Sequence, residues 1–175
     1  MTRVTIDHIA VMVSDIEKSL HFYRDLLGFE VVSPEEHIGG PIDRMTGISG
    51  VHMREYRLRA PGGVNGYRRD EGAAQLTFDL IQWIQPPSPV KRYPIHHVPS
   101  SHFAFGIRDL QPTYERLKKE GVQFVSPPVT FTGEGEWHVL FLYDPDGNLL
   151  ELNELVDSDL RHREQQAHKY AWTKG

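Results

Sequence analysis

The sequence predicts an α+β fold made of two tandem βαβββ modules, and three observations lead to that prediction. The segments 8–15 and 102–109 form an internal repeat, because each begins with histidine and ends with aspartate seven residues later. Both copies alternate in polarity like a strand. Both then carry apolar residues at helical spacing, up to a glycine that follows the aspartate by thirteen residues in the first copy and twelve in the second.

Each copy opens with a strand whose two faces differ in character. In the first copy Ile9, Val11 and Val13 alternate with a histidine, an alanine and a methionine. In the second copy phenylalanine and isoleucine alternate with His102, an alanine and a glycine. Because successive strand side chains point to opposite faces, one face is bulky and the other carries a histidine among mostly small residues. The bulky face suits packing under a helix, and the second face leaves room for a cavity.

A helix and three further strands are expected to complete each copy. Ser14 and Glu17 form a candidate capping box for the first helix, which Gly28 would end. Asp109 is the candidate cap of the second helix, and Gly121 would end it. The returning strands are expected at 29–32, 51–58 and 75–83, and then at 124–125, 137–143 and 148–152.

The prolines of the segment 86–94 mark the boundary between the two copies. We therefore expect a first module over residues 1–90, a linker over 91–100 and a second module over 101–156. A polar helical tail over 157–175 would follow, all within a single domain.

Composition narrows the classes of function. The 175 residues carry a formal net charge of −5 without a run of like charges, so neither nucleic acid nor a membrane is expected as a partner. The absence of cysteine excludes disulfides, thiolate ligands and a cysteine nucleophile. The N-terminus has no apolar signal region, and no stretch is long and apolar enough to span a bilayer, so we expect a cytoplasmic protein.

Each copy offers a histidine on its first strand and a carboxylate on its last. Glu151 lies between leucines in a strand otherwise fit for burial, and Asp79 occupies the matching strand of the first copy. A buried carboxylate is costly unless it is paired or metal-bound. Together with His8 and His102, one or two carboxylates suit Zn²⁺, Ni²⁺, Co²⁺, Mn²⁺ or Fe²⁺. The repeat places both histidines at the same structural point, which favours one divalent metal ion over two hydrogen-bonded core histidines.

Four segments also carry a family resemblance: Asp7-His-Ile-Ala-Val, Ser19-Leu-His-Phe-Tyr-Arg-Asp-Leu-Leu-Gly-Phe-Glu, Ser101-His-Phe-Ala-Phe and Asp144-Pro-Asp-Gly-Asn-Leu-Leu-Glu-Leu. They resemble the vicinal oxygen chelate superfamily, which includes glyoxalase I, methylmalonyl-CoA epimerase, extradiol dioxygenases and fosfomycin or bleomycin resistance proteins. The resemblance covers residues 4–155. It implies the glyoxalase/bleomycin resistance/dioxygenase fold, in which the modules form a half-open barrel around the metal.

The resemblance also implies ligand positions and an activity. The metal ligands would be His8, Asp79, His102 and Glu151, in an enzyme of the glyoxalase (lactoylglutathione lyase) or epimerase type. Such an enzyme chelates a small oxygenated substrate and transfers a proton next to a carbonyl, with Glu151 or Asp79 as the base. Related enzymes usually have glutamate or glutamine at the position of Asp79. Whether this shorter side chain reaches the metal directly, through water or not at all therefore stays open.

Two alternatives and two further expectations follow. An Fe(II) extradiol ring-cleaving dioxygenase would need two histidines and one glutamate, although Phe141 stands where such enzymes commonly have tyrosine. A metal-free binding protein would sequester its ligand, as resistance proteins do.

An arginine of the segment 35–69 could hold a substrate carboxylate. A homodimer is expected, because the sheets keep open edges and the superfamily usually pairs subunits, with Tyr170 and Trp172 of the tail as candidate contacts.

Overall fold

The structure is a computed structural model that describes residues 7–61, 77–98, 100–133 and 135–156. These residues form two compact units, one holding the first four strands and the other holding the last five. Mixed sheets with few helices make this an α+β fold, which confirms the predicted fold class. The predicted tail over 157–175 lies outside the described residues.

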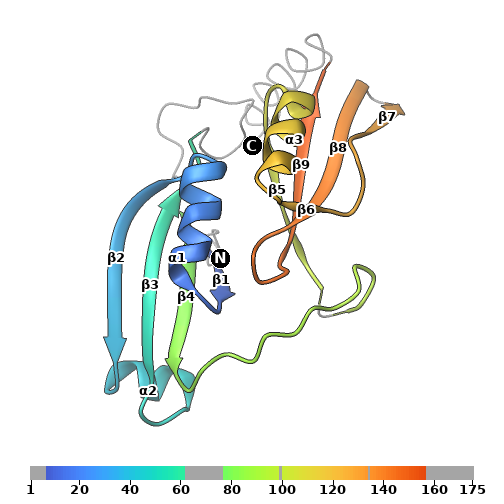
Figure 1. Cartoon of the computed structure of the whole chain (residues 1–175). Coiled ribbons are helices and arrows are strands. Elements are labelled where there is room, and N and C mark those ends of the chain that lie inside the picture. Colours follow the sequence, from blue (N-terminus) through green and yellow to red (C-terminus); the bar gives the residue numbers. More distant parts are fainter. Residues whose placement is uncertain (1–6, 62–76, 99, 134, 157–175) are drawn as a thin grey trace, which may run out of the picture. The chain divides into compact units, whose positions relative to one another are not determined.

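The first unit is a four-stranded sheet with a helix against one face (Figure 1). In chain order its elements are β1 (His8–Val13), α1 (Ile16–Leu20), the π-helical η1 (His21–Leu26), β2 (Glu30–Ile38), α2 (Pro41–Thr46), β3 (His52–Arg59) and β4 (Thr77–Gln85). The strand order is β1-β4-β3-β2. Strand β1 runs parallel to β4, and the other pairs are antiparallel.

The second unit repeats this plan. Its elements are β5 (His102–Gly106), α3 (Leu110–Lys119), β6 (Gln123–Phe124), β7 (Val129–Gly133), β8 (Gly135–Tyr143) and β9 (Leu149–Leu155). The strand order is β5-β9-β8-β6, with β7 also paired to β8. In both units the first strand pairs in parallel with the last, and the last pairs antiparallel with the strand before it.

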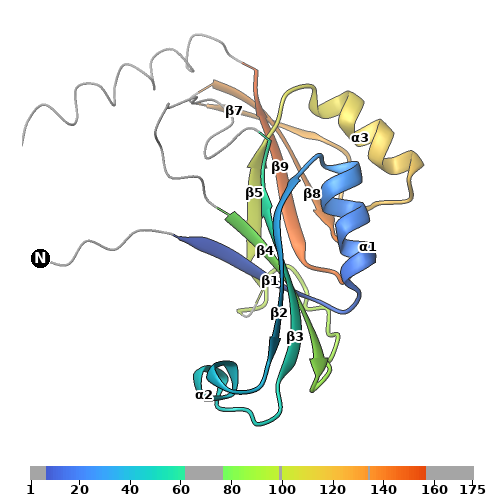
Figure 2. The ribbon, with the colours of Figure 1, turned by 90° about the vertical axis from the view of Figure 1, so that its left-hand side faces the viewer.

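In the first unit the helix covers one face of the sheet, and the turned view of Figure 2 shows α1 lying beside the strands. Tyr23 of η1 is fully buried, and its ring centroid lies 5.1 Å from that of Phe78 on β4. Phe78 and Val11 are buried on this helix-covered face. Because side chains alternate along a strand, His8 and Asp79 point to the other face. The hydrophobic core under the helix thereby fixes the strands that carry the candidate site.

The first helix is capped by Asp15, which corrects the predicted capping box at Ser14. The Asp15 carboxylate accepts the backbone N–H of Glu17 at 3.2 Å and that of the following residue at 3.3 Å. The helix begins at Ile16, so Asp15 directly precedes its first residue and reaches the exposed N–H groups of the first turn. The helical segment ends before Gly28, whose φ of 80° is the left-handed conformation expected of glycine there.

The second helix is capped from a neighbouring strand. Asp109 directly precedes α3, but its backbone is left-handed and its side chain makes no capping hydrogen bond, contrary to the prediction. The carboxylate of Glu154 on β9 instead accepts the N–H of Asp109 at 2.8 Å and that of Leu110 at 3.2 Å. The cap is thus a tertiary contact that no local sequence pattern indicates.

Strand β2 is longer than predicted. It continues past residue 32 to Ile38, which pairs with His52. Pro34 does not interrupt it, because β2 is an edge strand and needs ladder hydrogen bonds on one side only.

Candidate functional site

The two histidine–carboxylate pairs occupy equivalent positions in the two sheets. In the first unit His8 lies across from Thr77, and Asp79 lies across from the alanine two residues after that histidine. In the second unit His102 lies across from Leu149, and Glu151 lies across from the alanine two residues after its histidine. Each unit therefore presents one imidazole and one carboxylate on the same face of two adjacent parallel strands. The carboxylate is offset from the histidine by two residues along the strand direction.

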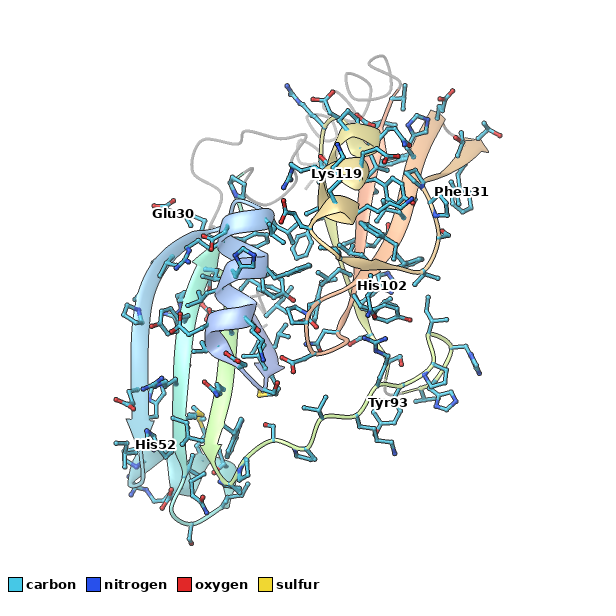
Figure 3. All side chains as sticks on the ribbon, in the orientation of Figure 1. Glu30, His52, Tyr93, His102, Lys119 and Phe131 are labelled. Carbon is cyan, nitrogen blue, oxygen red and sulfur yellow. The ribbon has the colours of Figure 1, made fainter. Side chains whose placement is uncertain are left out.

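In the second unit the pair is in contact. The Nε2 atom of His102 lies 3.3 Å from Oε2 of Glu151, and Figure 3 labels His102. The Asn153 side-chain amide donates to Oε1 of Glu151 at 3.1 Å. Phe141 is the register partner of Glu151 on β8, and its ring meets that of His102 edge-on, with 5.2 Å between centroids. A half-exposed imidazole and a partly buried carboxylate that face each other suit a divalent ion.

In the first unit His8 has a polar partner for one ring nitrogen. Its Nδ1 lies 2.9 Å from a carboxylate oxygen of Asp7. This hydrogen bond is the main reason why the pKa of His8 is raised above 6.5; partial burial opposes the shift, and the charge of Asp79 adds to it. A neutral imidazole that donates from Nδ1 keeps its lone pair on Nε2, the nitrogen that would bind a metal. His8 therefore fits a ligand role through Nε2.

Asp79 lies in a different environment from Glu151. Its side chain is only 2% exposed, and both oxygens face Arg57, with Nε 3.4 Å from Oδ1 and Nη2 3.4 Å from Oδ2. Arg57 is the register partner of Asp79 on β3, and Nη2 of Arg57 also lies 3.3 Å from Glu55. The hydrogen bond and the charge of Asp79 raise the pKa of Arg57. Asp79 thus already has the cationic partner that a buried carboxylate needs.

Sequence reasoning gave Asn153 no role at this site, and it gave Arg57 a different role from the one the structure shows. Arg57 lies within the segment 35–69, in which an arginine is expected to hold substrate, and the structure pairs it with Asp79 instead. Alternation along β3 could place Arg57 on one face, but only the β3–β4 register shows that Asp79 is its partner. Arg59 of the same segment pairs with Glu30 at 2.6 Å.

Each unit by itself presents one histidine–carboxylate pair. Among the described residues, no group of three or more histidine, aspartate and glutamate side chains is arranged to hold a metal ion. The assignment of His8, Asp79, His102 and Glu151 to one ion therefore stays a prediction. Within the described part of the chain, no helix is long and apolar enough to cross a membrane.

Comparisons with known proteins extend this picture. The model of the Glyoxalase/Bleomycin resistance protein/Dioxygenase superfamily matches residues 5–152. The chain is 28% identical to a virulence protein of Salmonella typhimurium over 86% of this chain and 84% of that protein. It is 25% identical to a lactoylglutathione lyase of Haemophilus influenzae over 84% of this chain and 90% of that enzyme. A glyoxalase family protein of Bacillus cereus shares the fold with a TM-score of 0.75 at 16% identity, over 90% of this chain and 97% of that one.

Proposed function

We propose, since the chain belongs to the Glyoxalase/Bleomycin resistance protein/Dioxygenase superfamily, that it is a divalent-metal-dependent enzyme of the glyoxalase or epimerase type. It would act on a small oxygenated substrate and move a proton next to a carbonyl. The observation that carries the proposal is the histidine–alanine–carboxylate arrangement at the same register in both units. The relative named lactoylglutathione lyase supports this reaction class.

In this proposal His8, His102 and Glu151 bind the ion, and Asp79 is the fourth candidate. A bound Zn²⁺, Ni²⁺, Co²⁺, Mn²⁺ or Fe²⁺ would act as a Lewis acid toward two substrate oxygens. A carboxylate of this set acts as the base only when it leaves the ion, and Glu151 is the better candidate because its side chain is 18% exposed and that of Asp79 only 2%. The amide of Asn153 holds one oxygen of Glu151, which would aim the other oxygen at His102 and the substrate.

An Fe(II) ring-cleaving dioxygenase is the second candidate. The observation in its favour is that Arg57 already engages Asp79, which leaves two histidines and Glu151, the ligand set of many non-haem iron oxygenases. Phe141, directly across from Glu151, supplies no acid or base of the kind that such enzymes commonly place nearby. A third candidate is a metal-free ligand-binding protein, because the family also contains bleomycin resistance proteins.

Metal analysis and two assays separate these candidates. Protein purified without chelator or affinity tag is expected to carry about one divalent ion per chain. His102→Ala should lose most of this metal, whereas the matched control His138→Ala should keep it, because His138 lies across from Glu154 on the opposite face of the same sheet.

Deuterium exchange next to the carbonyl of small hydroxy- and keto-substrates would support the lyase or epimerase. Oxygen uptake with catechols would favour the dioxygenase, and a metal-free wild type that binds ligand would favour the binding protein. We also place the protein in the cytoplasm, which cell fractionation would test.

A further inference from the structure

We propose that Arg57 keeps the carboxylate of Asp79 away from the metal, so that the ion has three protein ligands rather than four. This inference rests on the proposed metal site and deepens it, because it assigns opposite roles to the two repeated carboxylates. Glu151 binds the ion together with His8 and His102. Asp79 is instead a buried carboxylate paired with the partly exposed guanidinium of Arg57, and Arg57 is the positioning residue that decides this.

The geometry leaves the carboxylate of Asp79 poorly available to a metal ion. Both of its oxygens face the guanidinium, each 3.4 Å from a different nitrogen of Arg57, and the side chain is 2% exposed. A guanidinium and a carboxylate in this fork arrangement satisfy each other. A turn of either Asp79 oxygen toward a metal would lengthen its contact with Arg57 and weaken one of the two partners of the guanidinium. Because the Asp79 side chain is 2% exposed, moving its carboxylate away from the guanidinium would leave a buried charge without its main partner, although the guanidinium itself is 36% exposed.

Arg57 is held in place by more than Asp79. Nη2 of Arg57 also lies 3.3 Å from Glu55, whose side chain is 12% exposed. Glu55 in turn lies 3.5 Å from a ring nitrogen of His37 on β2. The guanidinium therefore lies between two carboxylates on one sheet face, and its position across from Asp79 is fixed by the strand register as well.

The second unit shows what the same position looks like without a guanidinium. The residue across from Glu151 is Phe141, which has no charge to offer. Glu151 is instead contacted by His102 and Asn153, and it is more exposed than Asp79. The repeat thus keeps the histidine–carboxylate register but places arginine beside one carboxylate and phenylalanine beside the other. This difference selects Glu151 as the carboxylate that binds the metal.

Titration of the metal-free protein with Co²⁺, followed by visible absorption and calorimetry, tests the inference without an activity assay. Asp79→Asn is expected to leave the affinity and the absorption spectrum unchanged. Arg57→Met is expected to raise the affinity by about tenfold and to change the spectrum, because Asp79 becomes available as a fourth ligand. The double variant should lose that gain. Arg57→Lys, which keeps a cation beside Asp79, should bind Co²⁺ like the wild type.

Arg59→Met is the matched control. Arg59 lies on the same strand face as Arg57, directly across from Thr77, which pairs with His8. The Arg59→Met substitution removes an equal positive charge two residues further along β3. It leaves the contact between Arg57 and Asp79 intact. Unchanged Co²⁺ binding in Arg59→Met would show that the gain in Arg57→Met does not come from long-range charge alone.

Several results would overturn the inference. A loss of affinity in Asp79→Asn well beyond the roughly 10- to 100-fold that removal of an outer-shell partner costs would make Asp79 a ligand, and a loss within that range would contradict the unchanged affinity expected here. Equal affinity in Arg57→Met and the wild type would remove the role of Arg57. A wild type that binds no Co²⁺ would overturn the proposed function itself, together with any ligand count. In metal-free protein kept in chelator, Arg57→Met should lower the midpoint temperature of thermal unfolding. Adding Asp79→Asn to this variant should restore part of the lost stability. Strictly additive losses would show that the two residues do not interact.

Discussion

Asp25 lies near the end of η1, where two basic side chains contact its carboxylate. The guanidinium of Arg24 donates from Nε to Oδ1 at 2.7 Å and from Nη2 to Oδ2 at 3.0 Å. The Nδ1 atom of His21 lies 3.2 Å from Oδ2. These contacts lower the pKa of Asp25 from 3.8 to about 2, and the hydrogen bond from Arg24 has the largest effect. The carboxylate is solvent-accessible, so salt will screen part of this effect.

We predict a pH-dependent contribution of Asp25 to stability. A carboxyl group whose pKa is lower in the folded state stabilises that state when it is ionised. The contribution of Asp25 is therefore fully present above its unfolded pKa of 3.8 and is lost as the pH falls through about 2. An NMR pH titration of the side-chain carboxyl resonance should give a midpoint of about 2. A midpoint near 3.8, or one that Arg24→Met leaves unchanged, would contradict the assigned partner.

At the scale of elements, α3 depends on a strand for its beginning. The N-terminal N–H groups of a helix need acceptors, and here both capping bonds come from Glu154 on β9. The carboxylate also meets the positive end of the helix dipole. The side chain of Glu154 is 18% exposed, and Nδ1 of His138 lies 3.7 Å from it. The cap therefore couples the position of α3 to the sheet beneath it.

Glu154→Ala is expected to destabilise the protein by about 0.5–2 kcal/mol, the range for loss of a helix N-cap. Chemical denaturation monitored by circular dichroism measures this loss. Glu136→Ala is the matched control, because the Glu136 carboxylate contacts the same histidine, at 3.1 Å, and is half-exposed. It should cost less than about 0.5 kcal/mol, as surface substitutions usually do. Equal losses in the two variants would mean that the histidine contact and not the cap carries the stability.

The elements also show what a sequence can and cannot reveal. The alternation around His8 and His102 and the glycine at the end of each helix predicted the opening strand and helix of each copy, because these signals are local. Helix α2 and strand β7 were not predicted. The caps at Asp15 and Glu154 were missed. The first differs by one residue from its predicted position, and the second comes from a distant strand. The pairing of Asp79 with Arg57 likewise depends on strand register, which the pattern of one strand does not contain.

At the scale of the whole molecule, the two units manage their sheet edges differently. The edge strand β2 carries the charged residues Glu30, Glu35 and Glu36 together with Pro34, which disfavour pairing with another strand. Strand β7 is short and pairs with β8 alone among the described strands. Its Phe131 is 60% exposed and is labelled in Figure 3. An exposed aromatic side chain on an open edge favours association through β7.

We therefore predict a homodimer that involves β7, with a mass by light scattering of about twice the 20.1 kDa of one chain. Phe131→Glu should shift the particle toward the mass of a single chain, because it would bury a charge in the contact. Ile38→Glu is the matched control: Ile38 is 72% exposed on the charged edge strand β2, and its substitution should leave the dimer intact. A single-chain mass for the wild type at micromolar concentration would refute the dimer. A Phe131→Glu variant that remains dimeric would show that the dimer contact does not lie at β7. The informative variant would then be one that lacks the segment after Val156, which contains Tyr170 and Trp172.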